Sequence, residues 1–123
     1  MVTKSKKILV AEDDPFLIKV MGTLLEDEGL TVDRAHDGEE AIKKLQTGKY
    51  SLVLLDLIMP GKTGFEVLEE AKKMKIKTPI LVFSNLSQEE DKQRVKALGA
   101  KGYYVKSDIS VGEVAAAVKK YVE

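Results

Sequence analysis

Four polar groups follow short apolar runs in this sequence, and their side chains together could bind a metal ion and a phosphoryl group. The groups are Glu12-Asp13-Asp14 after the run 8–11, Asp56 after 52–55, Ser84 after 80–83, and Lys106 after 103–105. Carboxylates that share a crevice repel one another and favour a divalent cation. The chain has no Cys and only one His, so oxygen ligands are left, which predicts Mg²⁺ with Mn²⁺ as the alternative.

Asp56 is the best candidate for a nucleophile, because it stands alone after its apolar run and a carboxylate can accept a phosphoryl group. Glu12 and Asp13 are adjacent and fit a metal-binding pair better. Lys106 and the metal would neutralise the charge that spreads over the phosphoryl oxygens during transfer. The Ser84 hydroxyl would donate a hydrogen bond to the same oxygens.

The elements that position these groups are predicted from the hydrophobic pattern. The four apolar runs lack polar alternation, which is typical of strands buried on both faces, whereas residues 31–35 alternate and predict an edge strand. Amphipathic segments of helical length follow each strand. The predicted helices run from Pro15, with Asp14 as cap, to before Gly29, from Asp37 to Gln46, and from three Ser/Thr-x-x-Glu capping boxes at Thr63, Ser87 and Ser110.

The predicted helices differ in the apolar surface that they offer to a core. The first presents a stripe at helical spacing that consists of Leu17, Val20, Met21, Leu24 and Leu25. The fourth offers mainly Val95 and Leu98, so it should be thinly anchored and able to move.

Alternating strands and helices predict one α/β domain, residues 1–123, with a parallel sheet between two layers of helices. In such a three-layer fold, ligands bind beyond the carboxyl ends of the strands, where the strand order reverses. Glu12, Asp13, Asp56, Ser84 and Lys106 are all expected at that edge.

Composition excludes several classes of function. Of the 123 residues, 20 are Lys or Arg and 20 are Asp or Glu, so the formal net charge is zero and non-specific binding to nucleic acid or an anionic membrane is not expected. The absence of Cys excludes disulfides, thiolate zinc sites and thiol catalysis. No apolar run approaches the length of about 20 residues that spans a bilayer, so a cytoplasmic setting is expected.

Four motifs spread over the chain resemble, in their order, those of response regulator receiver domains, in particular the stand-alone chemotaxis-type regulators. The motifs are ILVAEDD at 8–14, LLDLIMPG at 54–61 with Gly64 after it, FS at 83–84 and GYYVK at 102–106. The resemblance implies a flavodoxin-like doubly wound (βα)5 fold with strand order 2-1-3-4-5. It also implies a two-component phosphorelay switch, which is not an enzyme beyond catalysing its own phosphorylation and dephosphorylation.

The resemblance assigns a role to each matching position. Asp56 matches the phosphoacceptor, and Glu12 and Asp13 match the acidic pair that holds Mg²⁺ together with the backbone carbonyl of Ile58. Lys106 matches the lysine that binds the phosphoryl group, and Ser84 matches the hydroxyl residue that contacts it. Tyr103 matches the aromatic switch residue that turns inward when Ser84 moves. The implied donor is a sensor histidine kinase or a histidine phosphotransfer protein. The implied output is a downstream protein target, without direct nucleic-acid contact, of a monomer or a phosphorylation-dependent dimer.

Two positions depart from the family pattern. Ser107 follows Lys106 where the family usually has proline, and since a cis bond before a residue other than proline costs about 2.5–4 kcal/mol, a trans bond is predicted. Ile58 and Leu86 flank the acceptor where polar residues are common. Apolar groups there should hinder an attacking water, which predicts slow self-dephosphorylation.

Three other functions are alternatives to this one. Gly61-Lys62-Thr63 resembles the end of a nucleotide-binding phosphate loop, but Asp56 stands where that motif needs glycine. An aspartate-nucleophile phosphatase would need a second Asp two residues after the first, and Ile58 occupies that position. A pseudo-receiver that keeps the fold as a scaffold and is not phosphorylated remains the open alternative, which an activity test decides.

Overall fold

The computed structural model describes residues 6–123, in which five strands alternate with five helices; residues 1–5 of the predicted domain range 1–123 lie outside the described part. The elements are β1 (Lys7–Ala11), α1 (Pro15–Asp27), β2 (Thr31–Ala35), α2 (Gly38–Thr47), β3 (Leu52–Leu55), α3 (Gly64–Lys73), β4 (Ile80–Ser84), α4 (Glu89–Ala97), β5 (Gly102–Val105) and α5 (Val111–Val122). All strand pairs are parallel and the order is β2-β1-β3-β4-β5, so the predicted flavodoxin-like fold is confirmed.

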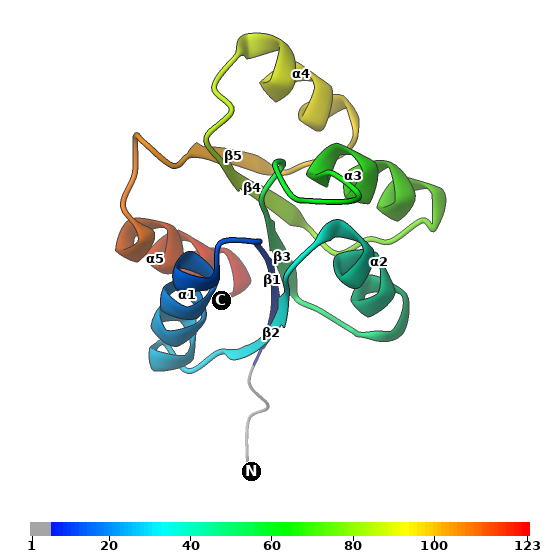
Figure 1. Ribbon diagram of the computed structural model, residues 1–123. Coiled ribbons are helices and arrows are strands. Elements are labelled where there is room, and N and C mark those ends of the chain that lie inside the picture. The colour runs from blue at the N-terminus through cyan, green and yellow to red at the C-terminus, as the bar shows by residue number, and fades with distance from the viewer. Residues whose placement is uncertain (1–5) are drawn as a thin grey trace.

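The sheet lies between two helical layers, each of which covers its own apolar core. Helices α1 and α5 lie on one side of the sheet, and α2 and α3 lie on the other, with α4 beside α3 at the top of the view (Figure 1). Successive residues of a strand point to opposite faces. In β3, Leu52 and Leu54 therefore enter the core under α1 and α5, whereas Val53 and Leu55 enter the core under α2 and α3. This explains why the central strands are apolar without alternation.

Four of the five predicted helix starts are confirmed. Asp14 and Asp37 cap α1 and α2 through their side-chain oxygens, and complete capping boxes begin α3 at Thr63 and α5 at Ser110. The box predicted at Ser87 is wrong: α4 begins one residue later, after Gln88, and the described residues give its first turn no side-chain cap.

Two predictions about the helix faces have different outcomes. In α1, the stripe is partly wrong, because Ile18, which it omitted, is buried with Met21 and Leu25, whereas Leu17, Val20 and Leu24 are only half-buried. The thin anchoring of α4 is confirmed, since Val95 is the helix's buried residue.

The peptide bond between Lys106 and Ser107 is trans, as predicted, because none of the bonds in the described residues is cis. No helix within residues 6–123 is both long enough and apolar enough to cross a membrane.

Candidate functional site

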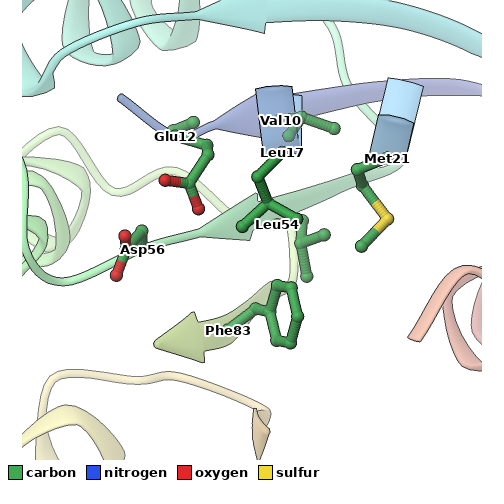
Figure 2. Close-up of a pocket in the computed structure, with 8 residues that line it drawn as sticks. Val10, Glu12, Leu17, Met21, Leu54, Asp56 and Phe83 are labelled. Carbon is green, nitrogen blue, oxygen red and sulfur yellow. The ribbon is translucent and has the colours of Figure 1, made fainter. Parts of the chain in front are cut away.

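Glu12 and Asp56 come together because β1 and β3 are adjacent and in register. Ala11 pairs with Leu55, so the next residue of each strand emerges at the same carboxyl edge of the sheet. Backbone hydrogen bonds continue the pairing, since Asp56 N donates to the Ala11 carbonyl at 3.0 Å and Glu12 N donates to the Ala35 carbonyl at 3.0 Å. Figure 2 shows both carboxylates at this end, one from each strand.

The carboxylates of Glu12, Asp13 and Asp56 form one cluster. Each offers an oxygen that lies within 4.8 Å of the oxygens from the other two. The residues Glu12 and Asp56 are each only 4% exposed, whereas Asp13 is exposed at the rim. Two buried negative charges at such a separation need a compensating positive charge.

Lys106 supplies that charge from the end of β5. Its Nζ lies 2.7 Å from Glu12 Oε1 and 2.9 Å from Asp56 Oδ2, and its side chain is only 16% exposed. Burial lowers the pKa of Lys106, but the hydrogen bonds that its ammonium group donates to the two carboxylates outweigh this effect, and the pKa is raised above its ordinary value. Lys106 therefore stays charged and ties the ends of β1, β3 and β5 together.

An apolar floor lies directly below the carboxylates. Val10, Leu17, Met21, Leu54 and Phe83 line it and leave a cavity of about 10 Å³, the lower limit for one water molecule (Figure 2). Burial against this floor is the main reason that the pKa of Glu12 rises from 4.5 to about 7, although hydrogen bonds from Lys106 and Asp14 N act in the opposite direction. One face of the site is thus dry and the other opens to solvent at Asp13.

The loop after β3 holds Asp56 from its other side. The N–H of Ile58 donates to Asp56 Oδ1 at 3.2 Å, and Gly64 N donates to the Leu57 carbonyl at 3.0 Å. A Cβ at Gly64 would lie 2.4 Å from the Asp56 carbonyl oxygen, so a side chain there would push the start of α3 away from the acceptor. This contact accounts for Gly64 in the motif that follows Asp56.

Within the described residues, Ser84 and Tyr103 make no hydrogen bond to the three carboxylates; both make their hydrogen bonds with the loop between β4 and α4. Ser84 is fully buried, and its Oγ accepts a hydrogen bond of 3.4 Å from Leu86 N. The half-buried Tyr103 donates its hydroxyl to the Leu86 carbonyl at 2.6 Å. Leu86 therefore links the two through its backbone, a role that side-chain chemistry cannot reveal because every residue carries the same backbone groups.

The residues present fit a hard divalent cation. The donor set consists of carboxylate oxygens, which Mg²⁺ prefers, and the exposed rim at Asp13 gives access from solvent. The buried carboxylates of Glu12 and Asp56 share a single ammonium group, so a cation at this edge would lower their mutual repulsion. The cluster can therefore act as an acidic metal-binding site beside a candidate nucleophile.

The fold and this acidic site define a class of signalling protein. The family model of the response regulator receiver domain matches residues 8–119, so the chain belongs to the receiver-domain family of two-component response regulators. Receiver domains are phosphoacceptor signalling modules rather than classical enzymes, and they work with a cognate histidine kinase.

Individual relatives agree with this membership. The alkaline phosphatase synthesis transcriptional regulatory protein PhoP of Bacillus subtilis is 39% identical over 115 residues, which are 94% of this chain and 48% of PhoP. The chain spans about half the length of the curated relatives that are among the most similar to it, such as PhoP.

Solved receiver structures match almost end to end. The receiver domain of the Francisella response regulator 1452 has a TM-score of 0.89 and 30% identity, covering 96% of this chain and 97% of that one. Thermotoga maritima TrrA, solved in complex with Mg²⁺-BeF, has a TM-score of 0.82 and 37% identity, covering 94% of this chain and 98% of that one.

Proposed function

We propose that this protein accepts a phosphoryl group on Asp56 from a phosphohistidine of a sensor histidine kinase or a histidine phosphotransfer protein. One observation carries the proposal: the Asp56 carboxylate is buried at a strand end between two further carboxylates and the Lys106 ammonium group. No other aspartate in the described residues combines burial with a metal-binding donor set.

In the transfer step, an Asp56 carboxylate oxygen forms a bond to phosphorus while the bond from phosphorus to the imidazole nitrogen breaks. The imidazole keeps the electron pair of that bond and leaves with the donor protein. Lys106, already 2.9 Å from Asp56 Oδ2, neutralises charge on the phosphoryl oxygens. Glu12, Asp13, Asp56 and the backbone carbonyl of Ile58 would hold Mg²⁺, which supplies further positive charge at the same oxygens.

The output of the switch begins at Ser84 and Tyr103. Phosphorylation adds strong acceptor oxygens to the site, and the Ser84 hydroxyl, which now accepts from Leu86 N, would turn to donate to them. Losing that bond frees the loop that also holds the Tyr103 hydroxyl. Because α4 buries only Val95, a change in the loop can shift the helix and alter the surface offered to a downstream protein.

Exposed apolar side chains beside the site support a protein donor. Phe16 and Ile58, the two most exposed large apolar residues of the described part, are 75% and 51% exposed. Phe16 follows Asp13 by three residues and Ile58 follows Asp56 by two, so each is close in sequence to a carboxylate of the cluster. An apolar rim around a charged centre is typical of a surface that a partner protein covers.

The proposal extends to the whole chain and its setting. Residues 1–123 form one receiver domain, a monomer or a dimer that forms on phosphorylation, and it works in the cytoplasm, where ATP charges histidine kinases.

Intact mass spectrometry tests the proposal. The protein is incubated with Mg²⁺ and a small-molecule phosphodonor, in parallel with Asp56→Asn and with a matched variant at an exposed aspartate elsewhere, Asp27→Asn. One phosphoryl group should be added to the parent and to Asp27→Asn, and none to Asp56→Asn or to samples with EDTA. If the parent gains no mass with any donor, the pseudo-receiver scaffold is the better description.

The lifetime of the phosphorylated form tests the role of Ile58 and Leu86. Ile58 is exposed two residues after the acceptor, and Leu86 is half-buried two residues after Ser84; we expect these apolar side chains to hinder an attacking water. Loss of the added mass should be slow and should accelerate in Ile58→Asn. A half-life of seconds in the parent would contradict this role.

A further inference from the structure

A groove of about 520 Å³ lies at the opposite end of the molecule from Asp56, between the ends of α3 and α4. Ile80, which lines the groove, is the first residue of β4. Asp56 and the other groups proposed to bind the phosphoryl group lie at the opposite edge of the sheet, where the strands end. Its volume is within the range of about 300–1,000 Å³ that is common for ligand sites. Nothing in the proposed phosphoryl chemistry uses this groove.

The groove has an apolar floor and a cationic rim. The floor consists of Leu68, Ala71, Ile76, Ile80 and Leu98. Four lysines, Lys72, Lys75, Lys77 and Lys101, stand around it, and none of the described lining residues is acidic. The concentration of charge is local, because the whole chain has a formal net charge of zero.

Helix dipoles do not account for this rim. Lysines are favoured in the last turn of a helix, and Lys72 is in that position in α3. Lys77 and Lys101, however, each follow a helix C-cap, Met74 or Leu98, by three residues, where the field of the helix end has faded. Their side chains are exposed, and within residues 6–123 neither lysine forms an ion pair that would give it a structural role.

We propose that this groove binds an acidic amphipathic segment of a partner protein, with aliphatic side chains on its floor and carboxylates at the lysine rim. Charge complementarity selects a segment with several acidic residues and excludes a basic one. The apolar floor favours a peptide over nucleic acid, whose backbone would need only the lysines, and no aromatic side chain in the described lining is available to stack on a base.

Such a segment would also contact α4. Lys72 Nζ donates to the Ala97 carbonyl at 3.3 Å across the groove, and Ala97 is the last residue of α4. A carboxylate that competes for Lys72 would release this contact. Since α4 is thinly anchored, occupancy of the groove can bias its position and thereby couple to the phosphoryl edge.

The experiment uses a short fluorescent peptide in which glutamate and leucine alternate. The control peptide has glutamine in place of every glutamate. Binding to the full chain is measured by fluorescence anisotropy at low salt, and the site is located by amide chemical shifts. The groove variant is Lys77→Glu with Lys101→Glu. The control variant, Lys19→Glu with Lys120→Glu, makes the same change in net charge at exposed positions of α1 and α5.

The groove variant should bind the acidic peptide at least tenfold more weakly than the parent, which corresponds to about 1.4 kcal/mol. The control variant should stay within twofold, and the glutamine peptide should not bind. Three results would overturn the proposal: no binding up to about 1 mM peptide, equal weakening in both variants, or displacement of the peptide by single-stranded DNA or by phosphatidylserine vesicles. The test is independent of phosphorylation and so does not depend on the function proposed for Asp56.

Discussion

Glu12 should make the stability of the metal-free protein fall as the pH rises. Burial raises its pKa from 4.5 to about 7 in the folded chain. The folded state therefore holds the proton more tightly than the unfolded state does. This contribution to the free energy of unfolding is complete below about pH 4.5, and it is lost as the pH rises through about 7.

The size of the effect follows from the same two pKa values. Each tenfold change in proton affinity corresponds to about 1.4 kcal/mol, so the whole effect is about 3 kcal/mol. Between about pH 5 and pH 8 the loss should be about 2–3 kcal/mol, because the unfolded chain is already partly ionised at the lower pH. The pKa values of Asp33, Glu40 and Glu113 are lowered, so these groups change the free energy of unfolding mainly at pH values below the range of about 5 to 8. The pKa of Lys106 is raised, so it changes this free energy only above that pH range.

Urea unfolding followed by circular dichroism at about pH 5 and about pH 8, with EDTA present, measures this loss. Glu12→Gln should remove about 2–3 kcal/mol of the pH dependence, whereas Glu113→Gln, at the exposed capping box of α5, should leave it unchanged. If Glu12→Gln keeps the full pH dependence of the parent, the inference that burial of Glu12 governs it is refuted.

Four further substitutions test three other contacts. Gly64→Ala would place a Cβ 2.4 Å from the Asp56 carbonyl oxygen and should cost about 1–3 kcal/mol of unfolding free energy, so a cost under about 0.5 kcal/mol in urea unfolding would contradict the contact. In the same assay, Ser110→Ala should lower the free energy of unfolding by about 1 kcal/mol and Ser87→Ala should leave it almost unchanged, because of these two serines only Ser110 caps a helix. Equal losses would show that Ser87 also caps a helix. Tyr103→Phe removes a hydrogen bond to the loop after β4 and should cost about 1 kcal/mol while hydrogen exchange in that loop accelerates; unchanged exchange would show that the hydroxyl does not hold the loop.

Local signals in the sequence predicted most of the elements. Apolar runs without alternation are typical of strands with a core on each face, and β1, β3 and β4 have that environment. The same expectation is wrong for β5, which is an edge strand and is only half-buried at three of its four residues. The Ser/Thr-x-x-Glu pattern predicted complete capping boxes at Thr63 and Ser110, but failed at Ser87. The sequence shows only whether the two side chains of a capping box are present. Whether the box forms depends on the backbone position at which the preceding loop ends and the helix begins.

The grouping of the candidate site was also predictable, because parallel strands end at one edge. That rule placed Glu12, Asp13, Asp56 and Lys106 together without any knowledge of distances. It could not predict that a single ammonium group bridges Glu12 and Asp56, since this depends on how far the Lys106 side chain reaches across the sheet.

By itself, the sequence determined the alternation of strands and helices, the chemistry available at the strand ends and the likeness to receiver domains, because periodicity, side-chain type and motif order are properties of the chain. Tertiary structure alone decided which groups are buried, how Leu86 links Ser84 to Tyr103, and that lysines from α3 and from two separate loops surround one apolar groove. Burial, backbone hydrogen bonds and grooves arise between segments that are distant in sequence, and they exist only once the chain is packed.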